Sequence, residues 1–262
     1  MPDFAPTILV FDSGLGGLTV YREVAAVRPD ARYIYTADDA AFPYGAWSED
    51  TLSERVAVVM EQLLHRFEPN LVVIACNTAS TLVLSELRRR FSLPFVGTVP
   101  AIKPACAASA SKLVSVLGTD ATVAREYTHG LIRDYAQGCE VTLVGSRRLA
   151  VLAEAHLRGE AVDRATIAAE IAPCFVQKDG TRTDTVVLAC THYPLLMAEL
   201  RAAAPWPVQF VDPAPAIARR VIELLGPAAD IQAPLSALMH FTSGSAPNPA
   251  LVASLQRYGF SA

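Results

Sequence analysis

The sequence LVVIACNTAS at residues 71–80 has a counterpart, TVVLACTHYP, at residues 185–194. Each stretch begins with an apolar run rich in β-branched residues and continues through Ala-Cys into polar residues. A short apolar run that ends in small polar residues is typical of a strand buried on both faces of a parallel sheet. We therefore expect Cys76 and Cys190 just past the carboxyl ends of two such strands, where open α/β sheets bind their ligands.

The residues around these two thiol strands indicate two similar halves. In each half a strand, a polar turn, a helix, a second strand and further helical sequence come before the thiol strand. In the first half the expected strands are residues 7–11 and 32–36, and residues 48–66 are an expected helix. In the second half the expected strands are residues 113–117 and 140–144, followed by helical stretches up to about residue 172. Strands that alternate with helices imply a parallel sheet. We predict an α/β fold of two similar domains, with mainly parallel sheets, flanking helices and an active site in the cleft between them.

The composition limits the classes of protein that the chain can be. Of its 262 residues, 52% are hydrophobic and 18% are charged, which supports a large core and excludes general disorder. The net charge of −4 gives no electrostatic footprint for nucleic acid or membrane. No apolar run is long enough to cross a bilayer, and residues 1–4 lack the basic start of a signal peptide.

The cysteines point to a reducing compartment. Their odd number and wide spacing argue against a disulfide framework, and none of them forms a CxxC pair that would suggest zinc. We therefore expect reduced thiols, no metal and a cytoplasmic protein. Cysteines outside the duplicated context are expected to be structural. The five are Cys76, Cys106, Cys139, Cys174 and Cys190.

Two sulfurs on opposite sides of one small molecule suit a reaction that removes a proton from one face of a carbon and returns one to the other. A thiol has a pKa of about 8.5, so a thiolate near neutrality needs about 2 kcal/mol of local stabilisation. Helix N-terminal amides after each cysteine can supply part of it. A nearby base can supply more, and the candidates are His192 for Cys190 and Asp12 for Cys76.

A glycine-rich turn, GLGGLT at residues 14–19, follows the first strand. It gives little support to a dinucleotide site because Thr19 stands where the third fingerprint glycine belongs, although Asp38 and Asp39 lie at about the spacing of a ribose contact. Turn amides also bind carboxylates. Hydroxyls, amides and N–H groups at the strand ends suit a zwitterion. The expected binding residues are Ser13, Tyr44, Gly45, Asn77, Thr78, Thr119, Thr122 and Thr191.

With these motifs the chain resembles the glutamate racemases, within the cofactor-independent aspartate/glutamate racemase family. The matching stretches run from one end of the chain to the other, and together they are highly specific. They are FDSGLGG (11–17), FPYG (42–45), ACNTAS (75–80), VGTVPAIKPA (96–105), Gly118-Thr119, CTHYPLL (190–196) and Thr242-Ser243-Gly244.

The resemblance implies a domain organisation and a set of roles. The first domain would be residues 1–97, completed by 208–262, and the second would be 98–207, with the boundary in a segment that holds three prolines. Cys76 and Cys190 would be proton acceptor and donor, assisted by Asp12 and His192. The pairs Asp12-Ser13, Tyr44-Gly45, Asn77-Thr78 and Thr191-His192 match the family's substrate-binding positions.

The resemblance further implies interconversion of L- and D-glutamate without pyridoxal phosphate, metal or nucleotide. It also implies a homodimer and a supply of D-glutamate for peptidoglycan synthesis, and hence for cell wall biogenesis and cell shape. The Cys-Thr-His form at Cys190 is similar to the glutamate enzymes, whereas aspartate racemases tend to have Cys-Thr-Glu. Three alternatives stay open: an aspartate racemase, a hydrolase with one cysteine as nucleophile and His192 as base, and a non-catalytic amino-acid-binding protein.

Overall fold

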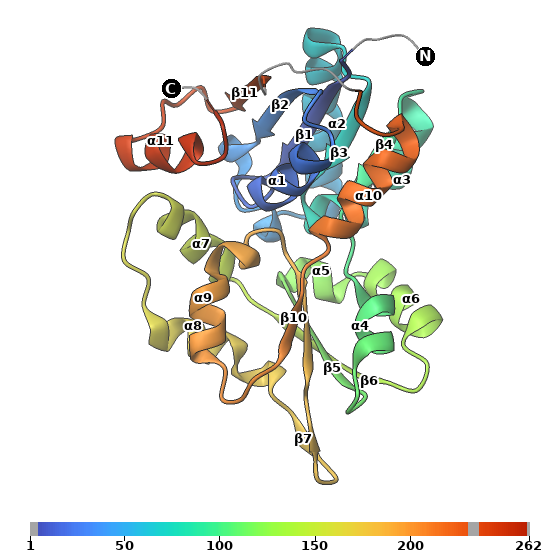
Figure 1. The fold of residues 1–262 in the computed structure, drawn as a ribbon, viewed down its shortest axis with the longest axis vertical. Coiled ribbons are helices and arrows are strands. Elements are labelled where there is room, and N and C mark those ends of the chain that lie inside the picture. Colours follow the sequence, from blue (N-terminus) through green and yellow to red (C-terminus); the bar gives the residue numbers. More distant parts are fainter. Residues whose placement is uncertain (1–4, 230–235, 261–262) are drawn as a thin grey trace.

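The computed structural model describes residues 5–229 and 236–260. They form two lobes, each built on one parallel sheet with helices around it, and Figure 1 shows the first lobe above the second. The strand order is β11-β2-β1-β3-β4 in the first sheet and β10-β9-β5-β6 in the second, and every pairing within the two sheets is parallel. This confirms the predicted α/β fold with two parallel sheets. The expectation about a signal peptide falls on residues 1–4, which lie outside the described residues.

The first lobe contains the amino-terminal third of the chain and the end of the chain. Its strands are β1 (Thr7–Asp12), β2 (Arg32–Ala37), β3 (Leu71–Ile74), β4 (Phe95–Gly97) and β11 (Ser236–Phe241). Its helices and 3₁₀ turns are α1 (Leu18–Val27), η1 (Asp39–Ala41), η2 (Tyr44–Ala46), α2 (Glu49–Phe67), α3 (Asn77–Arg90), α10 (Ala214–Leu225) and α11 (Pro249–Gln256).

The second lobe is formed by the middle of the chain. Its sheet strands are β5 (Leu113–Gly118), β6 (Glu140–Gly145), β9 (Thr185–Ala189) and β10 (Gln209–Val211), and a separate hairpin consists of β7 (Gln177–Lys178) and β8 (Thr181–Arg182). Its helices and 3₁₀ turns are α4 (Ile102–Ala108), α5 (Asp120–Ala124), α6 (Glu126–Tyr135), α7 (Leu149–Leu157), α8 (Arg164–Ile171), η3 (Ala172–Cys174), η4 (Tyr193–Leu196) and α9 (Met197–Ala203).

The two sheets repeat one topology. The order β2-β1-β3-β4 of the first sheet matches β6-β5-β9-β10 of the second, element by element along the chain. The thiol strands β3 and β9 therefore occupy equivalent places, each beside the first strand of its own lobe. The duplication predicted from the two Ala-Cys stretches thus extends to four strands per lobe.

Burial on both faces explains why the central strands are continuously apolar. In β1 the side chains of Ile8 and Val10 belong to one hydrophobic cluster, and those of Leu9 and Phe11 belong to another. Each such side chain stabilises the fold by about 1.5–3 kcal/mol when it is fully buried. The apolar runs therefore fix the position of the sheet, and the polar residues that follow them fall at its carboxyl edge.

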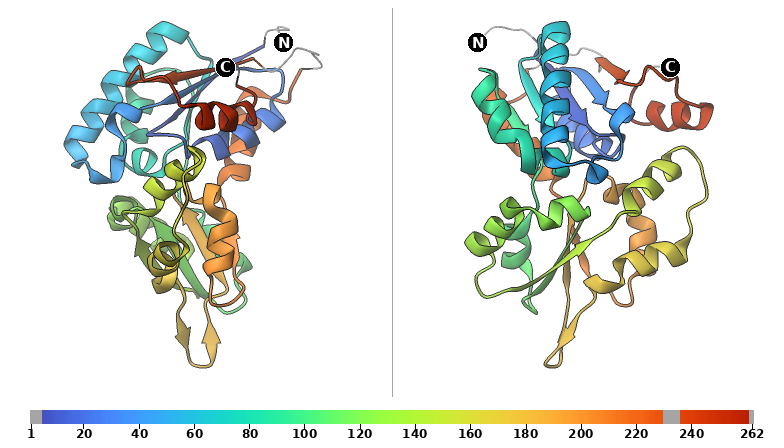
Figure 2. Two further views of the ribbon diagram at one scale, coloured as in Figure 1. Left: turned by 90° about the vertical axis from the view of Figure 1, so that its left-hand side faces the viewer. Right: turned by 180° about the vertical axis from the view of Figure 1, so that it is seen from behind.

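The chain crosses between the lobes after β4 and again after β10 (Figure 2). The expected return to the first domain at residue 208 comes too early, because Phe210 in β10 pairs with Val186 in β9 of the second sheet. The physical reason is the repeated topology, in which β10 is the counterpart of β4 and completes the second sheet. The return begins with α10, which packs against α1.

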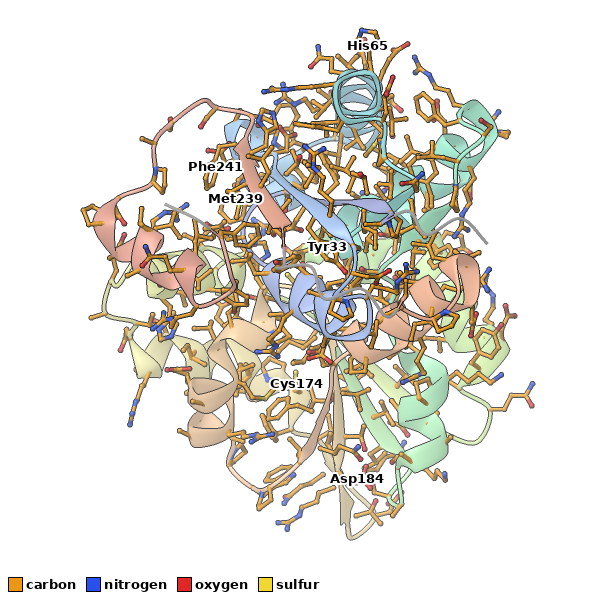
Figure 3. The ribbon with its side chains drawn as sticks, turned by 45° about the horizontal axis from the view of Figure 1, so that its top comes forward. Tyr33, His65, Cys174, Asp184, Met239 and Phe241 are labelled. Carbon is orange, nitrogen blue, oxygen red and sulfur yellow. The ribbon has the colours of Figure 1, made fainter. Side chains whose placement is uncertain are left out.

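The last strand, β11, extends the first sheet along its β2 edge. Figure 3 shows its Met239 and Phe241 near Tyr33 of β2, whereas Cys174 and Asp184 lie in the other lobe. The domain boundary that we placed in residues 93–104, on the basis of their three prolines, coincides with β4 and the start of α4, two elements that we did not predict. None of the helices within the described residues is both long enough and apolar enough to span a membrane.

Candidate active site

The two sulfurs lie at one cavity between the lobes. Cys76 follows β3 and is the N-cap residue of α3, and Cys190 follows β9 directly. Because both sheets end toward the other lobe, their carboxyl edges bring these residues to the same place. The cavity is lined by Ser13, Phe42, Pro43, Tyr44, Gly45, Cys76, Asn77, Thr78, Thr119, Ala150, Cys190, Thr191 and His192.

This cavity is closed in the structure. Its volume is about 20 Å³, measured as the space open to the centre of a water molecule, which is room for about one water. An amino acid needs far more space, so the lobes must separate to admit one. Closure of this kind removes water from a reaction and strengthens the electrostatic interactions inside the site.

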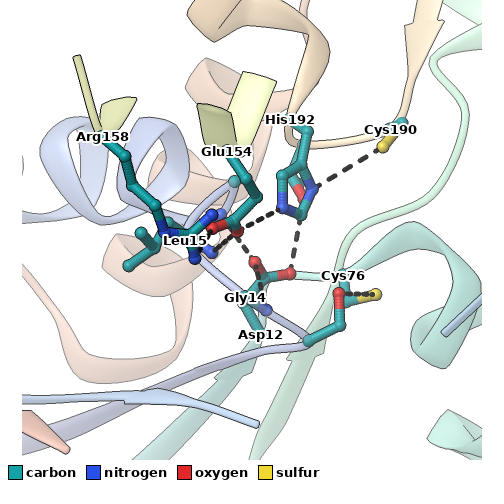
Figure 4. A network of polar contacts seen from close by, with 12 residues as sticks. Asp12, Gly14, Leu15, Cys76, Glu154, Arg158, Cys190 and His192 are labelled. Atoms are coloured by element: carbon teal, nitrogen blue, oxygen red, sulfur yellow. Dashed lines mark hydrogen bonds and ion pairs between the residues drawn. The ribbon is translucent and has the colours of Figure 1, made fainter. Parts of the chain in front are cut away.

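Cys190 is in contact with a buried chain of hydrogen-bonded acid and base groups that extends from the second lobe to the first. His192 Nδ1 lies 3.9 Å from Cys190 Sγ, and its Nε2 lies 3.0 Å from Glu154 Oε1. The same Glu154 oxygen accepts the N–H of Leu15 in the first lobe at 2.6 Å, and its other oxygen pairs with Arg158 at 2.8 Å. Figure 4 shows this network. The imidazole is therefore fixed between a sulfur and a carboxylate.

The charges of this network reinforce one another. Burial alone would lower the pKa of His192, but the hydrogen bonds to Cys190 and Glu154 and the charge of Asp12 raise it well above its usual value. Burial would raise the pKa of Glu154, but the hydrogen bond and charge of His192 lower it on balance. The pair is consequently an imidazolium–carboxylate ion pair near neutral pH, and the imidazolium is placed to donate to a thiolate of Cys190.

Cys76 has a different environment. Its sulfur lies 3.7 Å from Ser13 Oγ and belongs to a fully buried thiol. Burial, and then the negative charge of Asp12, raise the pKa of Cys76 to about 12, although the N–H of Ala79 at the start of α3 and the Ser13 hydroxyl oppose this shift. We expected helix amides to favour the thiolate here. They do so, but burial outweighs them, and Cys76 carries its proton in the closed structure.

Asp12 combines a structural contact with a place beside the cavity. One carboxylate oxygen accepts the N–H groups of Gly14 and Gly17, and the other lies 3.5 Å from the hydroxyl of Thr191 in the second lobe. Burial raises the pKa of Asp12, and the positive charge of His192 opposes that shift. Its carboxylate thus stabilises the glycine turn, while its charge acts on the catalytic candidates around it.

The loop that contributes Tyr44 and Gly45 is held by a second carboxylate. The Tyr44 hydroxyl donates to Asp38 at 2.6 Å, and Arg55 and Thr242 donate to the same carboxylate. Hydrogen bonds from these donors outweigh burial and lower the pKa of Asp38. The acidic side chain at the ribose-contact spacing is therefore fully engaged in orienting the loop.

Hydroxyls and one amide complete the walls. Thr78 Oγ1 of the first lobe lies 3.0 Å from Thr119 Oγ1 and 3.2 Å from Thr122 Oγ1 of the second. Asn77 is buried, and neither its side-chain nitrogen nor its oxygen has a hydrogen-bond partner among the described residues. A buried amide without partners costs about 1–3 kcal/mol, so a ligand or water that hydrogen-bonds to Asn77 would gain from that contact.

The structure thus brings the predicted residues together. Asp12 and Thr122 do not line the cavity themselves, but Asp12 lies within hydrogen-bonding distance of Thr191, and Thr122 of Thr78, which do. The residues that we did not predict are Phe42, Pro43 and Ala150 in the wall, and Glu154 behind His192. The other three cysteines, Cys106, Cys139 and Cys174, do not line the cavity. None of the five cysteines forms a disulfide within the part of the chain that the structure describes.

Comparisons with known proteins place the chain beside proteins of one family. Residues 17–221 match the model of the Asp/Glu/Hydantoin racemase family. The chain is 58% identical to a glutamate racemase of Brucella anthropi over 221 residues, which cover 84% of this chain and 80% of that protein. It is 59% identical to a glutamate racemase of Brucella abortus over 227 residues, or 86% and 82% of the two chains. The crystal structure of Escherichia coli glutamate racemase in complex with L-glutamate and the activator UDP-MurNAc-Ala superposes with a TM-score of 0.89 at 43% identity, covering 98% and 96% of the chains.

Proposed function

The chain belongs to the Asp/Glu/hydantoin racemase family and is an amino-acid racemase, and from this we propose that it interconverts L- and D-glutamate through proton transfers by Cys76 and Cys190. One observation carries the mechanism: a sulfur from each lobe lines the same closed cavity. The unpartnered Asn77 amide in the wall supports an amino-acid ligand, since it can donate to a carboxylate. The choice of glutamate is supported by the glutamate racemases to which the chain is similar.

In the direction from L- to D-glutamate, Cys190 takes the α-proton as a thiolate, and Cys76 delivers its own proton to the opposite face. The environments fit these roles. The His192 imidazolium stabilises negative charge on Cys190, and the raised pKa of Cys76 keeps its proton in place. In the reverse direction the two sulfurs exchange roles, so that Cys76 acts on D-glutamate. Positioned acid–base groups of this kind contribute about 10²–10⁴-fold to the rate.

The carbanion between the two transfers needs stabilisation as well. The small cavity is lined by hydroxyls and one amide that are already in position, so they need no reorganisation when charge develops. We propose that no cofactor takes part, because the two thiols supply both the acid and the base. The lysines give no support to a Schiff base, since Lys103 lies over the Tyr135 ring, Lys112 donates to the Cys106 carbonyl and Lys178 pairs with Glu140.

Isotope exchange tests the two-sulfur mechanism. L-Glutamate is incubated with the protein in deuterium oxide, and both enantiomers are separated early in the reaction and analysed by mass spectrometry. A two-base reaction gives D-glutamate that carries deuterium while the recovered L-glutamate keeps its hydrogen. Product without deuterium would show that one group carries the same proton across, and would refute the proposal.

Substitutions then assign the two sulfurs. Cys76→Ala and Cys190→Ala should each lower kcat/KM for racemisation by at least about 10²-fold. Cys174→Ala is the matched control, because Cys174 is also buried but does not line the cavity, and this variant should keep full activity. Aspartate, tested in parallel, should turn over far more slowly than glutamate. Faster turnover of aspartate would overturn the substrate assignment.

We propose further that the D-glutamate serves peptidoglycan synthesis in the cytoplasm, and that the protein is a homodimer, as the family resemblance implies. Depletion of the protein should stop cell wall growth, and added D-glutamate should restore it. Light scattering on the purified protein measures the oligomeric state.

A further inference from the structure

A buried guanidinium lies at the seam between the lobes, outside the network described above. Arg125 joins α5 to α6 in the second lobe, and its side chain is only 6% exposed. Its Nη1 lies 2.7 Å from Glu49 Oε1 at the start of α2 in the first lobe, and Glu49 is 68% exposed. The ion pair therefore joins a buried cation to a carboxylate that stays in water.

The Arg125–Glu49 ion pair does not stabilise the fold enough to explain the burial of Arg125. Arg125 Nε is buried and has no hydrogen-bond partner among the described residues, and such a donor costs about 1–3 kcal/mol or more when it belongs to a charged group. An ion pair with an exposed partner returns little of that cost. Burial lowers the pKa of Arg125, yet a guanidinium stays protonated at any physiological pH. The buried positive charge consequently lowers the stability of the fold. This cost suggests that the charge has a function, which it exerts through its electrostatic field.

The position of Arg125 places that field at Cys76. Helix α5 packs against α3 and η2 of the first lobe. Thr122, three residues before Arg125, lies within hydrogen-bonding distance of Thr78, two residues after Cys76. Arg125 therefore lies across the lobe interface from the start of α3, where Cys76 is the N-cap residue. Burial lowers the pKa of Arg125, and the negative charges of Glu49 and, to a smaller extent, Cys76 oppose that shift.

Cys76 lacks the cationic contact that its counterpart has. Cys190 has the imidazolium of His192 in hydrogen-bonding contact, whereas the only side chain bonded to the Cys76 sulfur is the neutral Ser13, among the residues that the structure describes. The groups whose negative charge acts against a Cys76 thiolate are Asp12, Cys190, Tyr35 and Tyr44. The His192 imidazolium lines the same cavity, but its two ring nitrogens face Cys190 and Glu154. A thiolate at Cys76 therefore needs a positive charge from elsewhere.

We propose that Arg125 is a positioning residue whose buried charge stabilises the thiolate of Cys76, and thereby enables the half-reaction that begins with D-glutamate. The proposal rests on the proposed two-sulfur mechanism for its catalytic meaning, but the effect on the thiolate can be measured without any turnover. In this proposal Arg125 stabilises the thiolate of Cys76 by its positive charge, as His192 does for Cys190.

Alkylation by iodoacetamide measures that effect. The whole protein is treated between about pH 7 and about pH 10, and the rate at each cysteine is followed by peptide mass spectrometry. Below the thiol pKa the rate falls about tenfold for each unit by which that pKa rises. Arg125→Gln should slow alkylation of Cys76 several-fold at every pH in this range and leave Cys190 unchanged in the same sample. Arg125→Lys, which keeps the charge, should restore most of the rate.

Glu49→Gln separates a field effect from a mechanical one. It breaks the ion pair across the lobes but leaves the positive charge of Arg125, so the Cys76 rate should stay the same or rise. If Glu49→Gln slows Cys76 as much as Arg125→Gln does, the residue is only a clamp between the lobes and the proposal is overturned. An unchanged Cys76 rate in Arg125→Gln overturns it equally. Arg125→Gln leaves no buried charge behind, and an unaltered near-ultraviolet circular dichroism spectrum verifies its fold.

Racemase kinetics provide the second readout. Because the two enantiomers have equal free energy, kcat/KM for the two directions must fall by the same factor in Arg125→Gln, but kcat and KM need not change alike. We expect the larger loss of kcat with D-glutamate. A larger loss with L-glutamate would contradict the assignment to Cys76. Retained racemisation in Cys76→Ala would refute the proposed function instead, and would leave the alkylation result standing.

Discussion

Replacing Glu154 is the most informative perturbation of the His192 network, because two substitutions dissect one carboxylate. The oxygen that faces His192 Nε2 at 3.0 Å also accepts the Leu15 N–H at 2.6 Å, while the other oxygen pairs with Arg158. Glu154→Gln keeps an acceptor oxygen for the first two donors, removes the charge, and replaces the acceptor that faces Arg158 by an amide donor. Glu154→Ala removes the acceptor as well.

The expected losses of unfolding free energy follow from this difference. Glu154→Ala leaves a buried imidazolium without its partner, which costs about 3–5 kcal/mol. Glu154→Gln turns charge-assisted hydrogen bonds into neutral ones, which costs about 1–2 kcal/mol. At about 2–4 °C per kcal/mol for a chain of this size, the melting temperature should fall by about 2–8 °C for Gln and by about 6–20 °C for Ala.

The dependence on pH has a definite sign. The folded-state pKa of His192 is raised, so its contribution to stability is complete below the ordinary value of 6.5 and is lost as the pH rises through the folded value. The pKa of Glu154 is lowered, so its contribution is present above the ordinary value of 4.5 and is lost as the pH falls through the folded value. The difference between the native chain and Glu154→Gln is therefore largest between about pH 4.5 and about pH 6.5.

Urea unfolding at about pH 4, 6 and 9 measures these differences, and Glu160→Gln, at an exposed position just after the same helix, is the control that should change stability by less than about 0.5 kcal/mol. A loss in Glu154→Gln that is the same at all three pH values would refute the ion pair. Equal losses for Gln and Ala would refute the role of the shared acceptor oxygen.

Two further substitutions test how the site is held. Gly16→Ala should lower kcat/KM by about 10²-fold, because a Cβ there would overlap His192 Nδ1 and displace the ring. Gly130→Ala, whose nearest atom is at 3.6 Å, is the control that should keep full activity in the same assay. Tyr44→Phe should lower the unfolding free energy by about 1–3 kcal/mol in thermal denaturation, because Asp38 loses a buried hydrogen bond; unchanged stability would contradict that account.

Much of the fold could be predicted because its signals are local. Apolar runs such as β3 and β9 are buried on both faces, so their composition and length identify them without any partner. The segments that were missed have weak local signals. The strand β4 has three residues and lies among prolines, and the short, partly exposed β10 was assigned to the wrong domain. Their places are set by hydrogen bonds to neighbouring strands that lie far away in the sequence.

The same distinction separates the predicted site residues from the missed ones. Cys76 and Cys190 follow recognisable strands, and Asn77, Thr78 and His192 lie beside them in the chain. Glu154 is separated from His192 by 38 residues and sits in the apolar sequence LAVLAEAHL. One signal was present: Glu154 is the acidic residue of that helix, and it falls on the face that buries Leu149, Ala150, Ala153 and Leu157. A carboxylate on a buried helix face needs a partner, and that requirement distinguishes Glu154 from the exposed acidic residues of the chain.

The repeated topology explains both the symmetry of the site and its limits. Two equivalent strands bring two cysteines to one cavity, which is the arrangement that the proposed two-base reaction needs. The walls, however, consist of L-amino acids, so mirror-image substrates cannot meet mirror-image surroundings. The structure accordingly gives Cys190 an imidazolium and Cys76 a hydroxyl. Since the equilibrium constant between enantiomers is one, this asymmetry must cancel in kcat/KM, and it can appear only when kcat and KM are compared one by one between the two directions.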